Sequence, residues 1–240
     1  MPGYYVNVSE VCLRHPPLRH LIAELLKSAN VPGQYSITQS DGKEAAGVEV
    51  HPWQCGNLRI LGIHRNYGLM VSELGPADYQ KQTALRRTLE MKIDFEQEVA
   101  LYDSRLGIFL GKKKTHLFPL SDIQPTILAI LPEPVKDLEI YAPKQASPGE
   151  LVEVRLNLNG PVLGNTHTFR VQLIDPSGRE LPMLTRNLAA PGGKVLWELP
   201  LAVNLPQGEC RLRVREIVTG THGERRLVIS NSRWAALGRS

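Results

Sequence analysis

The sequence predicts a mainly β protein with a small α/β remnant at its N-terminus, a β meander, and a seven-stranded immunoglobulin-like β-sandwich at its end. Apolar and polar residues alternate along most of the 240 residues, which is typical of half-buried strands. Only one stretch has convincing helical spacing. The 20 glycines and 18 prolines supply the frequent turns that many short strands need.

Residues 1–75 are predicted to form the α/β remnant. Its helix is expected over about 17–29, where prolines suit the first turn and Leu18, Ile22 and Leu25 follow at helical spacing. One strand is expected before the helix. The strands expected in this segment are Tyr4–Val8, Tyr35–Thr38, Val48–His51 and Leu58–His64.

Residues 76–133 are predicted to form a small β domain. The polar, irregular stretch Gly75–Leu85 suggests the boundary before it. Pro132-Glu133-Pro134 reads as a stiff linker after it, because proline restricts its own backbone and that of the residue before it. The expected strands are Leu89–Phe95, Val99–Tyr102, Ile108–Leu110, Thr115–Phe118 and Thr126–Leu131.

Residues 135–230 are predicted to form the sandwich, and 231–240 a loose tail. Seven short strands over roughly 100 residues fit the immunoglobulin type. The disulfide of antibody domains cannot form, since only Cys210 falls in this region. The expected strands are Leu138–Tyr141, Val152–Leu158, Phe169–Leu173, a short edge strand at Leu181–Leu184, Val195–Leu199, Cys210–Val214 and Arg225–Ile229.

Composition narrows the expected partners and compartment. The net charge of +4 is spread along the chain, and the one basic run, Lys112–Lys114, is short, so no nucleic-acid partner is expected. No run approaches the ~20 apolar residues of a membrane span. Met1–Tyr5 shows no signal peptide, so a cytoplasmic location is expected unless the N-terminus lies upstream. Three cysteines without disulfide or metal spacing favour a reducing compartment.

No motif in the chain predicts a catalytic residue, a cofactor or a metal site. Gly107–Lys112 misses the phosphate-loop spacing by one residue, and a strand running into a basic turn is expected there. The seven histidines lack HxH and HExxH spacing. Five of them are each expected to be a surface or turn residue: His51, His64, His116, His167 and His222.

Trp53 is the candidate sugar contact. It lies next to a turn in His51-Pro52-Trp53-Gln54, and an exposed tryptophan could stack on a sugar ring, pack under a loop or meet another domain. Trp197 alternates with Val195 and Leu199 and is expected in the core.

The first half resembles the C-terminal part of glycoside hydrolase family 42 and related β-galactosidase-like proteins. The resemblance covers roughly Tyr4–Pro132 and is carried by short motifs, listed here: Tyr4–Val8, Leu21–Leu26, Asn30-Val31-Pro32, Gly47–Val50, Leu58–Asn66, Tyr102–Gly107 and Leu110-Gly111. It implies the end of an amidotransferase-like trimerisation domain followed by a small β domain. The catalytic barrel and its two glutamates have no counterpart here, so no catalytic residue carries over.

The leading hypothesis is a non-catalytic accessory or assembly region of a β-galactosidase-like protein. Its expected partners are another copy of the chain or the rest of a larger chain. One alternative is a carbohydrate-binding module that uses an exposed aromatic residue. Another is a small hydrolase with an unrecognised carboxylate pair, which the abundant acidic residues leave open.

Overall fold

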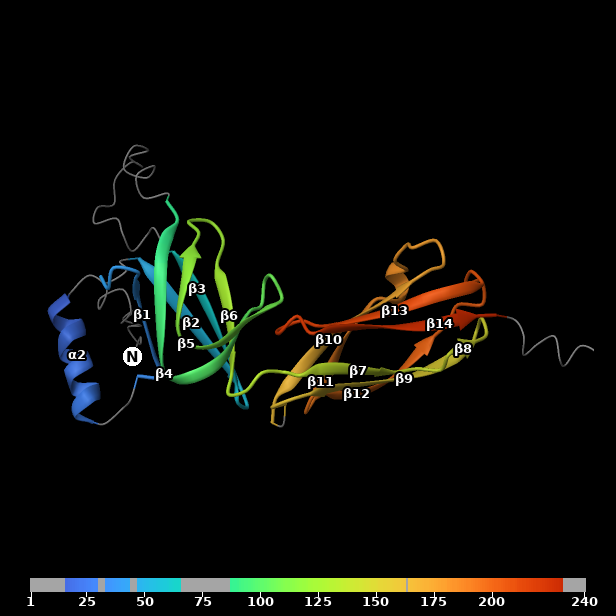
Figure 1. Ribbon diagram of the computed structural model, residues 1–240, viewed down its shortest axis with the longest axis horizontal. Coiled ribbons are helices and arrows are strands. Elements are labelled where there is room, and N and C mark those ends of the chain that lie inside the picture. The colour runs from blue at the N-terminus through green and yellow to red at the C-terminus, as the bar shows by residue number, and fades with distance from the viewer. Residues whose placement is uncertain (1–15, 30–32, 44–46, 66–86, 163, 231–240) are drawn as a thin grey trace, which may run out of the picture. The chain divides into compact units, whose positions relative to one another are not determined.

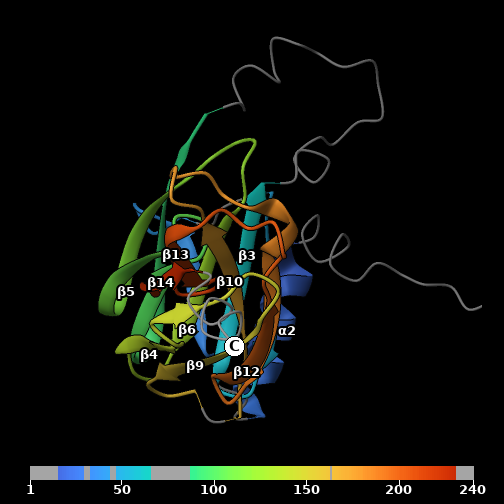
Figure 2. The same cartoon turned by 90° about the vertical axis from the view of Figure 1, so that its right-hand side faces the viewer.

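The computed structural model describes residues 16–29, 33–43, 47–65, 87–162 and 164–230, and the protein is mainly β (Figures 1 and 2). The expected strand Tyr4–Val8, the stretch Gly75–Leu85 and the tail 231–240 lie outside the described residues. The chain divides into two compact units. Unit 1 comprises Met1–Pro52, Leu61–Val99 and Lys113–Ile127, and unit 2 comprises Trp53–Ile60, Ala100–Lys112 and Leu128–Ser240.

The predicted helix is α2, Pro16–Ser28. It begins at a proline. The first N–H groups of a helix have no acceptor within the helix, so a residue without an N–H fits this position. Leu21, Leu25 and Leu26 on this helix are exposed. Within the described part of the chain, no helix has the length and apolar character to cross a membrane.

A six-stranded sheet contains all the strands that the structure describes in the first half. In the order β1-β4-β6-β3-β2, each strand is hydrogen-bonded to the next, and β5 pairs with β4. The strands are β1 (Tyr35–Gln39), β2 (Val48–Cys55), β3 (Leu58–Arg65), β4 (Leu89–Asp103), β5 (Ile108–Leu120) and β6 (Thr126–Leu131). Because β1 pairs with β4, and β3 with β6, the predicted segments 1–75 and 76–133 share this sheet.

Two strands are longer than predicted. Leu89–Phe95 and Val99–Tyr102 belong to one strand, β4, and Ile108–Leu110 and Thr115–Phe118 belong to β5. Lys112–Lys114 therefore lie in a strand, and the predicted basic turn is wrong. Ladder hydrogen bonds are made by the backbone, so exposed charged side chains need not interrupt a strand. The Lys112 ammonium lies 2.9 Å from the Glu133 carboxylate.

The second half is the predicted immunoglobulin-like β-sandwich. One sheet has the order β11-β10-β13-β14-β8 and the other the order β12-β9-β7. Figure 1 labels both sheets. The strands are β7 (Asp137–Tyr141), β8 (Gln145–Ala146), β9 (Leu151–Asn159), β10 (Thr166–Ile174), β11 (Arg186–Pro191), β12 (Lys194–Pro200), β13 (Gly208–Glu216) and β14 (His222–Ile229).

The sandwich core comes from the alternation seen in the sequence. Along β9, Val152, Val154, Leu156 and Leu158 are buried and alternate with exposed or half-buried polar residues. Strands β10, β13 and β14 contribute in the same way, and the free Cys210 is buried among these residues. Trp197 on β12 is half-buried and packs against this core, as predicted.

The predicted edge strand Leu181–Leu184 is wrong. Pro182–Leu184 forms a 3-10 turn with a proline in its first turn and Leu184 buried. Proline lacks the N–H that a sheet ladder uses, which favours the turn. The strand in this part of the chain is instead Arg186–Pro191, which pairs with β10 from Val171 to Thr166. The two-residue strand β8 is an eighth sandwich strand that the sequence did not predict.

We expect Leu173→Ala to lower the free energy of unfolding by about 2–5 kcal/mol, because a fully buried leucine leaves a cavity when truncated. Leu173 is fully buried on β10. Leu151→Ala, at an exposed position on β9, is the matched control and should change it by no more than about 0.5 kcal/mol. Urea unfolding followed by tryptophan fluorescence measures both. Equal effects would show that Leu173 is not part of the core.

Candidate functional site

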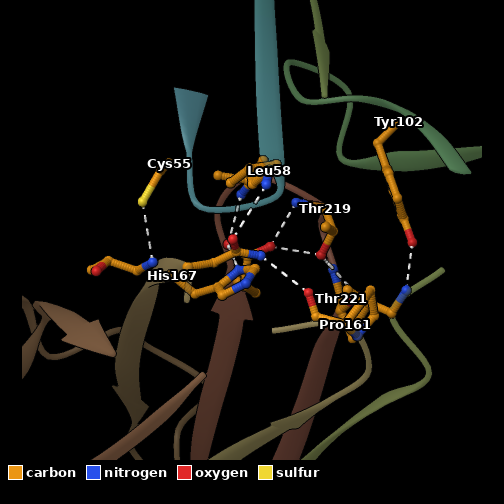
Figure 3. Close-up of polar contacts among 12 residues, drawn as sticks. Cys55, Leu58, Tyr102, Pro161, His167, Thr219 and Thr221 are labelled. Atoms are coloured by element: carbon orange, nitrogen blue, oxygen red, sulfur yellow. Dashed lines mark hydrogen bonds and ion pairs between the residues drawn. The ribbon is translucent and has the colours of Figure 1, made fainter. Parts of the chain in front are cut away.

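A buried asparagine joins the β2–β3 turn to the sandwich within unit 2 (Figure 3). The Oδ1 of Asn165 accepts hydrogen bonds from the backbone N–H groups of Asn57 (2.8 Å) and Leu58 (3.2 Å). Its Nδ2 donates to the Asn57 Oδ1 (2.6 Å) and the Pro161 carbonyl (3.1 Å). Asn165 is 1% exposed. An amide side chain offers two donors and two lone pairs, so all four are used.

Two glycines allow the backbones to approach at this junction. Gly56 has a φ of +59°, and a Cβ there would overlap the Gly164 carbonyl and the Asn165 side chain. Gly220 has a φ of +76°, and a Cβ there would overlap the Gly107 carbonyl. A side chain at either position would meet rigid backbone. The β2–β3 turn and the β4–β5 turn are thus fitted closely to the sandwich.

Tyr102 and Cys55 add two further hydrogen bonds to the junction (Figure 3). The Tyr102 hydroxyl accepts from the backbone N–H of Val135 at 2.8 Å, and the Cys55 sulfur accepts from that of Thr166 at 3.3 Å. Burial raises the pKa of Tyr102, so the phenol stays protonated at neutral pH. The bond to Val135 holds the segment that follows Pro132-Glu133-Pro134.

A buried carboxylate lies beside the junction. Glu216 and His167 are both 0% exposed, and the His167 Nδ1 lies 3.3 Å from the Glu216 Oε1. Glu216 Oε2 accepts from the backbone N–H and the hydroxyl of Thr219, each at 2.6 Å. Burial raises the pKa of Glu216, but His167 and the Thr219 donors outweigh it and the pKa is lowered. The prediction that His167 is a surface or turn residue is therefore wrong, since it lies on β10 and its side chain is fully buried.

Three potential metal ligands meet in unit 1, where the sequence predicted no metal site and scattered histidines. Glu49 and His51 lie two residues apart on β2, and His64 lies on the neighbouring β3. The two Nε2 atoms lie 3.5 Å (His51) and 3.2 Å (His64) from the same oxygen, Glu49 Oε2. The imidazole rings stack, with centroids 5.1 Å apart. Alternate residues on a strand share a face, so Glu-x-His was the missed signal.

An open groove of about 680 Å³ lies on the sheet β12-β9-β7. Glu139 and Tyr141 from β7, Arg155 and Asn157 from β9, and Lys194 from β12 line it. The Glu139 carboxylate accepts from the Tyr141 hydroxyl (2.9 Å) and the Asn157 Nδ2 (3.0 Å). Hydrogen bonds from Asn157 and Tyr141 lower the pKa of Glu139, so it is ionised at neutral pH.

The polar row of the groove continues along β7 and β9. Asn159 receives a hydrogen bond from the Asn157 Nδ2 at 3.0 Å and donates one to Asp137 at 2.6 Å. The Asn157 Oδ1 is buried and has no hydrogen-bond partner among the described residues. Asp137 and Asn159 also line a second hollow, of about 660 Å³. The face thus offers ionised, amide and phenol groups side by side.

Trp53, the predicted sugar contact, lies on β2 and is 57% exposed. It does not line the groove on β12-β9-β7. Its role as a sugar contact stays a prediction. The groove residues were missed because Glu139, Tyr141, Arg155 and Asn157 look like the ordinary solvent-facing residues of two strands.

Comparisons with known proteins do not assign the chain to a family. No known protein-family model and no curated protein matches the chain. Among solved structures, the sulfur carrier protein SoxY from Chlorobium limicola f thiosulfatophilum is similar over 39% of this chain and 78% of its own. The identity is 16% and the TM-score 0.26, and this likeness carries no argument about function.

We expect Thr219→Val to destabilise the protein by about 1.5–3 kcal/mol at neutral pH, the range for a hydrogen bond to a charged group. The lowered pKa of Glu216 means that its ionised form stabilises the fold above the ordinary carboxyl pKa of 4.5. That stability is lost as the pH falls through the lowered value. The difference between variant and wild type should therefore shrink in acid.

Urea unfolding across the acid range measures this difference, with Thr219→Ser as the matched control because it keeps the hydroxyl donor. A Thr219→Val penalty that stays constant from neutral pH into acid would contradict the assigned role of the Glu216 charge.

Proposed function

We propose that this chain is a non-catalytic accessory region that holds an immunoglobulin-like sandwich at a defined position in a larger β-galactosidase-like assembly. The observation that carries the proposal is the Asn165 junction. The link to β-galactosidase-like proteins comes from the sequence resemblance alone. Within unit 2, the hydrogen bonds of the buried Asn165 side chain attach the β2–β3 turn to the sandwich, and a spacer needs an attachment of this kind.

The proposal accounts for how the polar groups of unit 2 are used. Asn165, Tyr102 and Glu216 all make hydrogen bonds to the backbone of the turns that surround them. An enzyme keeps titratable groups where substrate can reach them. The strongly buried titratable pair, His167 and Glu216, is closed to substrate, and this favours a structural role.

Asn165→Ala tests the joint. It leaves the N–H groups of Asn57 and Leu58 without their acceptor, which costs about 1–3 kcal/mol at the buried Leu58. In the wild type we expect these two amides to exchange with solvent as slowly as the sandwich core. In the variant they should exchange faster while core amides such as that of Val171 stay protected. Hydrogen exchange followed by NMR measures both.

Asn187→Ala, at an exposed position on β11, is the matched control and should leave both amides protected. Rapid exchange of the Asn57 and Leu58 amides in the wild type would overturn the spacer proposal.

The non-catalytic part of the proposal has its own test. The purified chain should hydrolyse a panel of aryl glycosides no faster than the buffer does. A rate above background that Glu139→Gln abolishes would instead support the hydrolase alternative, because Glu139 and Asp137 are carboxylates on one face of β7.

The second candidate function is saccharide binding, and the groove on β12-β9-β7 favours it. Sugar hydroxyls both donate and accept hydrogen bonds, and the groove offers the Glu139 carboxylate, the Asn157 amide and the Arg155 guanidinium. Tyr141 is exposed and supplies an aromatic face. Binding sites combine apolar and aromatic surface with a few placed polar groups, and this groove has that composition.

If the groove binds a saccharide, Tyr141→Ala should weaken binding at least about tenfold, the effect of losing about 1.4 kcal/mol of contact. Trp53→Ala should leave binding unchanged. Glycan-array screening followed by calorimetry measures both. The reverse pattern would place the sugar at Trp53, and no binding to any glycan would remove this candidate.

A further inference from the structure

We propose that Glu49, His51 and His64 bind a divalent transition-metal ion of the zinc type. This inference is independent of the proposed function, because all three residues lie in unit 1 and none belongs to the Asn165 junction or to the groove. They are brought together by two neighbouring strands of one sheet rather than by a loop, so the backbone that carries them is regular.

The separations of the ligand atoms fit one ion. Tetrahedral ligands held at ~2.0–2.1 Å from Zn²⁺ lie about 3.3 Å from one another. The Glu49 Oε2 lies 3.2 Å from the His64 Nε2 and 3.5 Å from the His51 Nε2. The ligand atoms all lie within 4.8 Å of one another. Two of the three distances between ligand atoms therefore fit a tetrahedral ion already. A small rotation of one exposed imidazole would shorten the third, between the two Nε2 atoms.

The donor types select the class of metal. Two imidazole nitrogens and one carboxylate oxygen suit Zn²⁺, Co²⁺, Ni²⁺ and related ions, whereas Mg²⁺ and Ca²⁺ prefer oxygen alone. Metal ions bind imidazole in its neutral form and carboxylate in its ionised form, so this ligand set would bring one negative charge to a divalent ion.

The exposure of the three side chains leaves the site open to an ion and to water. The exposed fractions are 25% for Glu49, 38% for His64 and 51% for His51. Three protein ligands with an accessible fourth position are the arrangement of open zinc sites. β2 is at the end of the order of the described strands. A bound ion would therefore link side chains of β2 to a side chain of β3.

Calorimetry with the tag-free full chain and ZnCl₂ tests the proposal. We expect one Zn²⁺ per chain, no binding of Mg²⁺, and a loss of at least about tenfold in affinity in His51→Ala and in His64→Ala, since even groups behind the ligands commonly contribute this much. Glu49→Gln should also weaken binding, because it removes the charge. Addition of Co²⁺ should selectively perturb the ring NMR signals of His51 and His64.

His20→Ala, at an exposed position on α2, is the matched control and should bind Zn²⁺ as the wild type does. Circular dichroism checks that each variant is folded, and His64→Gln replaces His64→Ala if the latter is not. The proposal is overturned if the wild type binds no Zn²⁺, if His64→Ala binds it as the wild type does, or if His20→Ala loses as much affinity.

Discussion

Burial of the Asn165 amide is the constraint on which the junction in unit 2 depends. Asn165 and Asn57 are 108 residues apart in the chain, yet each satisfies polar atoms of the other. A buried amide without partners costs more than its hydrogen bonds contribute when made, so these two residues are a unit. Gly56 must lack a Cβ for the amide to reach the turn. The hydrogen bond between Tyr102 and Val135 adds a second contact to the junction.

The same principle explains why charge can lie inside the sandwich. Glu216 is buried because Val218 and Thr219 donate hydrogen bonds to its oxygens, and the His167 ring lies beside them. Burying such a group costs free energy, and neighbouring protein groups rather than water stabilise its charge. The Glu216 carboxylate therefore makes its hydrogen bonds to the turn after β13. The groups that a ligand could reach lie on the strand faces.

Both accessible sites arise from the alternation of residues along strands. Glu49 and His51 share one face of β2, as Asp137 and Glu139 share one face of β7. Alternation by itself says only that two such side chains point the same way. The third metal ligand, His64, and the partner of Glu139, Asn157, come from neighbouring strands, and strand pairing is a long-range property. This is why the sequence suggested scattered histidines and singled out Trp53.

The glycoside hydrolase resemblance concerned residues before the sandwich, and the structure shows what two of them, Tyr102 and Gly107, contact. Tyr102 of the resembling hairpin is buried and holds the Val135 amide, and Gly107 lies against Gly220. These positions have a structural reason within this chain, which is compatible with a family origin and does not require one.

The sequence alone determined the mainly β class, the helix, and the sandwich from about Val135 to Ser230, because period-two burial is a local property that each strand carries itself. It did not reveal that β4 and β5 are long strands, that Pro182–Leu184 turns while Arg186–Pro191 pairs, or that the first two predicted segments share one sheet. Those outcomes depend on which backbones find partners. Only the tertiary structure decided them, because hydrogen bonds between distant strands leave no pattern in either strand alone.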